Sequence, residues 1–264
     1  MAADLPGDGQ SKTYKFQFVK SGEDPIPVGN TVGILHVADS QTNKTTIIGV
    51  PWFALGEKIT VDSLVYLGNR EAGDKISAYD ADNSRYWTWE LKQGENGLAW
   101  ESVYNTTTES TAEAPAANTF ELKRGQGLFL ERVNPETKPI YLVGRVAEAG
   151  DTTVPTALPA GSSTTPTWTL IAAPSTADLD LNTANPVADP GSDTIVVATT
   201  GAGINVPYTY ANGKWGCPKS EQRTRNNGKV TYWVTVRSEE NVKIPAGTGF
   251  WYLNTGSEKS AQWK

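Results

Sequence analysis

A chain of 264 residues with 38% hydrophobic and 20% charged residues has an ordinary globular composition and is long enough for one large or two medium-sized cores. The net charge is −6, and the basic residues occur singly among acidic ones, which argues against nucleic acid and anionic membranes as partners. No apolar stretch approaches the length of a membrane span, with runs like Ile47–Val50 among the longest, so we expect no insertion into a membrane.

The N-terminal residues favour a protein outside the cytoplasm. Residues 1–9 carry no basic and no hydrophobic segment, so we expect no signal peptide there. Ala2-Ala3-Asp4 is similar to the start that remains after cleavage behind small residues. The chain also has 9 tryptophans but a single Met and a single Cys, a composition common in exported proteins. We therefore expect a mature secreted or cell-surface chain.

Residues 1–40 are expected to form an N-terminal strand region. Tyr14–Val19 alternates apolar and polar residues, as an extended strand with one apolar face does. The segment Thr13–Lys20 suits two roles, either an edge strand of its own sheet or a donor strand that pairs with a neighbouring subunit.

The rest of the chain contains an internal repeat of roughly 120 residues. Five anchors recur in the same order. They are Ile47–Pro51 with Leu170–Pro174, Asp74–Ala78 with Asp193–Val197, Trp87–Trp89 with Tyr208–Tyr210, Trp100 with Trp215, and Phe120–Leu130 with Val242–Tyr252. The last pair carries Gly-x-Gly turns, whose first glycine is expected to be left-handed and whose second is expected to admit an aromatic neighbour.

Short alternating runs such as Val230–Val236 and Asn-Gly turns such as Asn227-Gly228, with almost no helical periodicity, predict an all-β fold with antiparallel strands and little helix. We interpret it as two tandem repeats of a β-sandwich or barrel-like unit. Residues 1–40 are the N-terminal strand region and 41–150 are the first unit. A linker rich in Thr, Pro and Ala covers 151–166, and the second unit covers 167–264.

Few residues suit catalysis or metal binding. The sole cysteine, Cys217, and the sole histidine, His36, are interpreted as structural residues, and no pair of carboxylates is singled out as acid and base. Asp80 and Asp82 begin a run similar to a calcium loop, but its central glycine and final glutamate are missing. We predict no enzyme, no catalytic residue, no metal and no cofactor.

The tryptophans are the remaining candidates for a binding site. Trp87 and Trp89 lie two residues apart and therefore share one face of a strand. Trp251 stands between Phe250 and Tyr252. If exposed, Trp87, Trp89 and Trp251 are an aromatic platform for sugar rings. The competing interpretation, which we favour, is that they belong to the core, because aromatic residues recur at equivalent repeat positions.

At the repeat anchors the chain resembles a β module of secreted bacterial proteins, which opens with W-x-L-I-x-x-P and closes with I-x-P-G-x-G-F-W. Thr167–Pro174 and Val242–Tyr252 carry this pattern, and Ile47–Pro51 and Leu122–Leu130 carry it less strictly. The segment Pro27–Val37, followed by Thr45–Pro51, also resembles the start of an uncharacterised family of exported bacterial proteins. The resemblance implies export and a β fold, and it supplies no catalytic or ligand residues.

We therefore predict a non-catalytic structural or adhesive protein, secreted or on the cell surface, which self-assembles by strand addition into an oligomer or filament. The alternative is a carbohydrate-binding module that holds surface glycans on exposed Trp and Tyr side chains. A glycan-active hydrolase is the second alternative.

Overall fold

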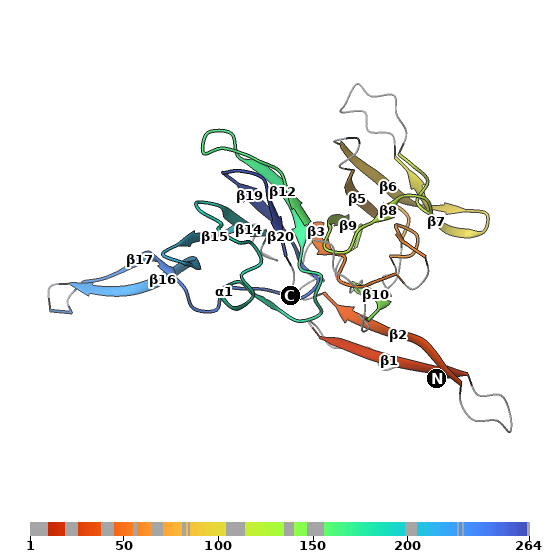
Figure 1. The fold of residues 1–264 in the computed structure, drawn as a ribbon, viewed down its shortest axis with the longest axis horizontal. Helices are drawn as coiled ribbons and strands as arrows, with labels where there is room; N and C mark the ends of the chain where they lie inside the picture. Colours follow the sequence, from red (N-terminus) through yellow and green to blue (C-terminus); the bar gives the residue numbers. More distant parts are fainter. Residues whose placement is uncertain are drawn as a thin grey trace. The chain divides into compact units, whose positions relative to one another are not determined.

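The computed structural model describes residues 10–18, 26–37, 45–54, 57–64, 71–80, 83, 85–103, 114–134, 140–146, 156–198, 205–225, 227–228 and 230–262. Within these ranges the protein is almost entirely β, with antiparallel sheets, and the all-β prediction is confirmed (Figure 1). The one helix in this part of the chain is α1 (Leu181–Ala184). Its first turn is capped by Asp180, whose carboxylate accepts the backbone N–H groups of Asn182 and Thr183.

The first repeat folds around an antiparallel sheet with the strand order β3-β9-β5-β6-β7. Its strands are β3 (Thr45–Gly49), β9 (Gly127–Glu131), β5 (Lys75–Asp80), β6 (Arg85–Gly94) and β7 (Gly97–Ser102). A two-stranded sheet of β4 (Ile59–Thr60) and β8 (Glu121–Leu122) accompanies it.

The second repeat has the strand order β12-β19-β14-β15-β16-β17. These strands are β12 (Thr167–Ala172), β19 (Gly249–Asn254), β14 (Thr194–Ala198), β15 (Asn205–Ala211), β16 (Lys214–Arg225) and β17 (Val230–Ser238). Two short sheets pair β13 (Leu179–Asp180) with β18 (Lys243–Ile244), and β11 (Thr156–Leu158) with β20 (Lys259–Ala261). Strand β11 lies in the segment predicted as the linker.

The strand orders of the two repeats correspond position by position. β12, β19, β14, β15 and β16 follow one another as β3, β9, β5, β6 and β7 do, and the β13–β18 pair matches the β4–β8 pair. The duplication stays a prediction from the sequence, and this correspondence is what it would produce. In the described part of the chain the first sheet ends at β7, whereas β17 extends the second sheet by one strand.

The N-terminal strands form a sheet of their own. β2 (Ile26–His36) lies between β1 (Ser11–Phe18) and β10 (Tyr141–Arg145), and both neighbours are antiparallel to it. Most of the candidate segment Thr13–Lys20 is therefore in β1 and pairs within its own chain, while residues 19 and 20 lie outside the described residues.

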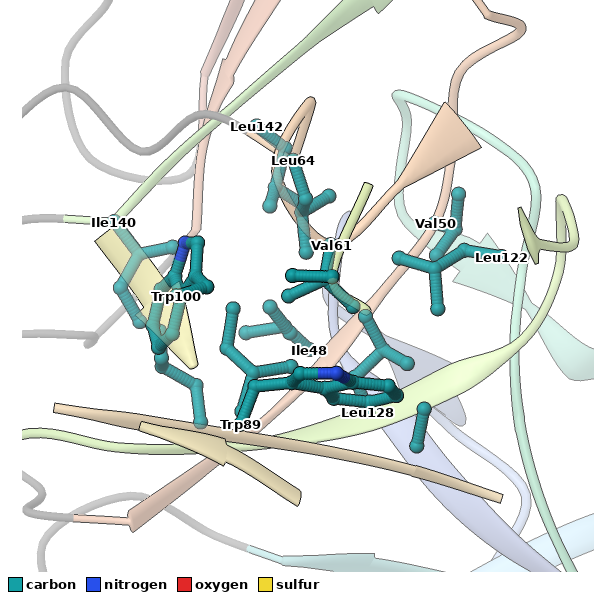
Figure 2. Packing of buried hydrophobic residues seen from close by; sticks show 14 of the residues in the cluster. Ile48, Val50, Val61, Leu64, Trp89, Trp100, Leu122, Leu128, Ile140 and Leu142 are labelled. Carbon is teal, nitrogen blue, oxygen red and sulfur yellow. The ribbon is translucent and has the colours of Figure 1, made fainter. Parts of the chain in front are cut away.

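Side-chain alternation explains the core of the first repeat. Along β6 every second residue from Trp87 to Leu91 is buried, so this face of the sheet carries large apolar groups inward. Figure 2 shows the Trp89 ring lying beside Leu128 and Ile48, with Trp100 nearby in the same cluster. Burying each of these side chains contributes about 1.5–3 kcal/mol relative to exposure.

Two buried aspartates, Asp74 and Asp193, make the same contact in each repeat. Asp74 precedes β5 and accepts the backbone N–H of Val133 at 2.9 Å, just beyond β9. Asp193 precedes β14 and accepts the backbone N–H of Thr255 at 2.8 Å, just beyond β19. Each carboxylate thus replaces a ladder hydrogen bond where its strand pair ends, which gives a physical reason why aspartate recurs at this anchor.

The chain divides into two compact units: residues 1–154, 170–178 and 245–249 form the first, and 155–169, 179–244 and 250–264 form the second. The first unit thus contains two short segments of the second repeat. Within it, Gly49 N donates to Gly247 O at 2.8 Å, and Ala172 N donates to Gly125 O at 2.8 Å. Gly49 and Ala172 occupy equivalent repeat positions, as do Gly125 and Gly247, so the two hydrogen bonds are reciprocal.

The Gly-x-Gly turns differ in part from expectation. Gly125 and Gly247 have φ angles of 85° and 71°, which confirms the left-handed turn. The second glycines of both turns are confirmed as points of close approach, but their neighbours are aliphatic. A Cβ on Gly127 would lie 2.7 Å from Leu170 Cγ, and one on Gly249 would lie 2.5 Å from Ile47 Cγ2.

Candidate functional site

The predicted aromatic platform does not form on the first sheet, because Trp87 and Trp89 are core residues. Trp89 is 0% exposed, and its indole N–H donates to the Pro115 carbonyl at 2.7 Å. The indole N–H of Trp87 donates to Asp80 Oδ2 at 2.7 Å. Both rings point to the covered face of β6, so neither offers a free face to a ligand. Trp251 belongs to the other sheet, on β19.

The Asp80 carboxylate is occupied by protein donors. Besides Trp87 it accepts the backbone N–H of Asn83 at 3.2 Å and the Asn83 side-chain amide at 2.8 Å. Asp82 lies outside the described residues. No group of three or more His, Cys, Asp or Glu residues suited to a metal occurs in the described ranges. Asp80 therefore serves here as the hydrogen-bond acceptor of a hairpin end.

A second buried carboxylate, Asp193, lies in a polar cluster that the sequence did not reveal. Tyr252 Oη and Lys259 Nζ each lie 2.6 Å from Asp193 Oδ2, and the Thr255 hydroxyl donates to Oδ1 at 3.0 Å. Burial, followed by the hydrogen bond and charge of Asp193, raises the pKa of Tyr252. Lys259 also donates to the Pro190 carbonyl at 3.0 Å. Because these groups are satisfied by one another, the cluster holds the end of the sheet together.

A cavity in the first unit is too small for a substrate. It has a volume of about 50 Å³ and is lined mainly by apolar side chains, among them Val50, Trp52, Phe53 and Leu64. Sites for small organic ligands usually measure about 300–1,000 Å³. The candidate sites that remain lie on exposed surfaces.

One aromatic pair on the second sheet has an exposed member and a half-buried one. Trp168 on β12 is 51% exposed, and its ring packs edge-on against Trp251 of β19 with centroids 6.1 Å apart and planes at 88°. Trp251 stands opposite Val196 of β14, which in turn stands opposite Pro207 of β15. We call Trp168, Trp251, Val196 and Pro207 the outer aromatic face. Of the three predicted platform residues, only Trp251 belongs to it.

The second exposed feature is the long hairpin of β16 and β17, which extends past β15 in Figure 1. The strands pair in a regular register from Cys217↔Ser238 to Arg225↔Val230. No described residue between Pro218 and Val236 is buried, so neither face of this two-stranded segment is covered. We call residues 218–236 the ribbon.

The two faces of the ribbon differ in chemistry. Residues opposite one another in an antiparallel pair share a face. One face therefore carries Trp233, 68% exposed, between Thr231 and Thr235. The other face carries Tyr232, 40% exposed, with Val230, Val234 and Val236. On β16, opposite these residues, Arg223 pairs with Glu221 at 3.5 Å, and the Arg225 guanidinium lies 5.8 Å from the Tyr232 ring.

Arg237 fastens the base of the ribbon. Its guanidinium donates to the carbonyls of Lys214 at 2.6 Å and Thr209 at 3.3 Å, and to Glu239 Oε1 at 2.7 Å. Arg237 lies over Gly216, where a Cβ would come within 2.6 Å of its Cζ. The hydrogen bond from Arg237 and, less strongly, the charge of Lys214 lower the pKa of Glu239. These contacts tie β17 to the β15–β16 hairpin.

The outer edge of β17 completes the candidate site. The strand pairs with β16 on one side and, in the part of the chain that the structure describes, with no strand on the other.

The sequence predicted this strand and its Asn227-Gly228 turn, but Trp233 and Trp168 were not among the predicted site residues. A usable signal was the character of same-face neighbours. Two positions before and after Trp233 on its strand are threonines, which suit an exposed face. The corresponding neighbours of Trp89 are Trp87 and Leu91, which suit a buried face.

Comparisons with protein-family models, with curated proteins and with solved structures found no match. The similarity to modules of secreted bacterial proteins therefore stays a prediction from short motifs. Among the described residues no helix is long and apolar enough to cross a membrane.

Proposed function

We propose that this chain is a non-catalytic structural or adhesive protein of the cell exterior that associates through the outer edge of β17. The observation that carries the proposal is the edge itself. Seven consecutive residues, Val230–Val236, follow a regular register with β16 and include no charged residue, no proline and no glycine.

An edge of this kind favours pairing with another strand. Exposed edges present unpaired backbone N–H and C=O groups, and proteins usually protect them with charges, prolines or bulges. The stretch Val230–Val236 has none of these protections, and it presents Tyr232 and Trp233, large aromatic side chains, to solvent. An added strand satisfies the outward backbone groups and covers apolar surface in the same step.

The location and the absence of catalysis rest on the sequence. The composition and the similarity of the repeat motifs to secreted modules support an exported protein. The titratable cluster around Asp193 is buried and internally satisfied, which supports a structural role for it.

The test is the molar mass of the purified chain, measured by size-exclusion chromatography with light scattering over a range of concentrations. We expect a mass above that of the monomer that increases with concentration. The variant Thr231→Lys/Thr235→Lys places two charges on the edge strand and is expected to be monomeric.

The matched control is Ser220→Lys/Thr224→Lys. These residues are exposed, lie opposite Thr235 and Thr231, and share their face, but they belong to the inner strand β16. The control therefore adds the same charge one strand away from the edge and should associate as the unmodified chain does. A monomer at every concentration, or equal loss in both variants, would disprove the proposal.

A second candidate function, carbohydrate binding, is favoured by the outer aromatic face. Trp168 and Trp251 offer adjoining aromatic surface on a sheet, and the apolar C–H faces of pyranosides stack on such rings. Screening on a glycan array with Trp168→Ala tests it, and Trp233→Ala serves as the control because Trp233 is even more exposed. Binding that Trp168→Ala abolishes and Trp233→Ala retains would support this function, and no retention on any glycan would eliminate it.

A further inference from the structure

The edge strand β17 is nearly a palindrome. The stretch is Val230-Thr-Tyr-Trp-Val-Thr-Val236, with Trp233 at its centre. One position from the centre, Tyr232 lies on one side and Val234 on the other. Two positions away both residues are threonine, and three positions away both are valine. Two of these three positions therefore carry the same residue on both sides of Trp233. The position next to Trp233 carries an aromatic residue on one side and a β-branched residue on the other. Both of these residue classes favour strands.

We propose that the partner of this edge is the β17 strand of a second copy of the chain, antiparallel to it and centred on Trp233. This inference rests on the proposed function and adds the partner, the direction and the register. Along the ribbon the product is a continuous sheet of four strands in the order β16-β17-β17-β16, related by a two-fold axis through the Trp233 pair. Such an interface uses the same surface patch on both copies.

The register follows from the side-chain alternation. A two-fold axis perpendicular to the sheet places each side chain on the same face of the sheet in both copies. Opposite residues of an antiparallel pair also share a face, so the register must be centred on a residue and not between two residues. Centring on Trp233 pairs every residue of Val230–Val236 with another residue of the same stretch. Thr231 then faces Thr235 of the second copy, and Val230 faces Val236. Centring one residue away, on Tyr232 or Val234, sets Trp233 opposite a threonine and leaves residues at one end without a partner.

The chemistry of the two faces agrees with a second copy. On one face the pairs are Trp with Trp and Thr with Thr, and on the other they are Val with Val and Tyr with Val. Aromatic pairs, aromatic–β-branched pairs and Thr–Thr pairs are all favourable across strands. The charged residues that flank the stretch in the sequence are Lys229 before it and Arg237 after it, and neither belongs to the seven paired residues. Arg237 is engaged with Glu239 and the Lys214 carbonyl of its own chain. Like charges therefore do not meet within the seven paired residues.

The size of the contact sets the expected strength. One strand pair of seven residues buries less than the roughly 800 Å² per partner typical of stable interfaces. We therefore expect a weak association whose extent increases with the concentration of the chain, because the contact between the two edges is short.

Disulfide trapping in the full chain tests the register. In a Cys217→Ser background, Thr231→Cys and Thr235→Cys are made separately, with tags of different size. The register places residue 231 opposite residue 235 of the partner, within the Cα separation of about 7 Å that a disulfide allows. Two copies of residue 231 lie four positions apart, about 13 Å. We expect roughly tenfold more disulfide-linked dimer from the mixture than from either variant alone.

The control is Ser220→Cys, which lies opposite Thr235 on the same face but in β16, and it should not crosslink. If the chain associates by light scattering but each single variant crosslinks as well as the mixture, or none does, the register fails while the proposed function stands. If the chain neither associates nor crosslinks, both fail.

Discussion

The hydroxyl of Tyr252 donates a 2.6 Å hydrogen bond to Oδ2 of Asp193, a carboxylate that is fully enclosed by the end of the second sheet. The same oxygen lies 2.6 Å from Lys259 Nζ, and the other oxygen accepts from the backbone and side chain of Thr255. A single carboxylate thus connects β14, β19 and β20.

Replacing Asp193 should therefore destabilise the protein strongly. Asp193→Ala leaves a largely buried ammonium group and a buried hydroxyl without their acceptor, and breaking a buried ion pair on one side costs about 3–5 kcal/mol. Tyr252→Phe removes one donor and leaves the others paired, so its cost should be about 1 kcal/mol. Urea unfolding followed by fluorescence measures both. Equal losses in the two variants would contradict the view that Asp193 organises the cluster.

The turn glycine Gly247 should tolerate no side chain. Its φ is +71°, and a Cβ would lie 2.7 Å from Leu35 Cδ2. Gly213 is the control because its φ is +79° while nothing lies within 4 Å of its Cβ position. Gly213→Ala therefore reports backbone strain alone, about 1 kcal/mol, and Gly247→Ala adds overpacking of about 1–3 kcal/mol. Thermal unfolding should rank the two in this order, and the reverse rank would refute the packing at the turn.

Loss of Arg237 should loosen the ribbon without unfolding the protein. Arg237→Ala removes the hydrogen bonds to Lys214 and Thr209 that fasten β17 to the β15–β16 hairpin. We expect faster proteolytic cleavage between residues 218 and 236 and an unchanged cleavage rate elsewhere. Arg223→Ala is the control, since Arg223 makes only a surface ion pair with Glu221 at 3.5 Å. Equal cleavage of both variants would show that Arg237 does not hold the ribbon.

Stability should fall at high pH partly through Tyr86. Burial and, less strongly, the neighbouring Tyr79 raise the pKa of Tyr86 from 10.0 to about 12. Above pH 10 the unfolded chain loses this proton while the folded chain keeps it, so stability present below pH 10 declines as the pH rises toward 12. In Tyr86→Phe the decline over this interval should be shallower. Parallel pH profiles of the two proteins would rule out the contribution.

Much of the fold was predictable because it depends on local pattern. Alternation in Val230–Val236 and the Asn227-Gly228 turn specify a hairpin without knowledge of any distant residue. The recurring aspartates at 74 and 193 were identified as repeat anchors, and the structure supplies the reason, a buried hydrogen bond to the strand that follows the Gly-x-Gly turn.

Exposure was less predictable, because alternation divides a strand into two faces without saying which face another layer covers. Trp87 and Trp233 both alternate in strand-forming sequences, yet the first is buried and the second is 68% exposed. Their difference arises from distant residues such as Leu128, which packs beside the first repeat's tryptophans. The neighbours of Gly127 were missed for the same reason, since Leu170 follows it by more than forty positions in the sequence.

The reciprocal bonds from Gly49 to Gly247 and from Ala172 to Gly125 make the two copies of the repeat mutually dependent. Each copy supplies a donor from the end of its opening strand and an acceptor from its turn, so neither copy alone completes this hydrogen bonding. A protease cut between residues 151 and 166 should therefore yield two fragments that migrate together in native gels and separate only in denaturant.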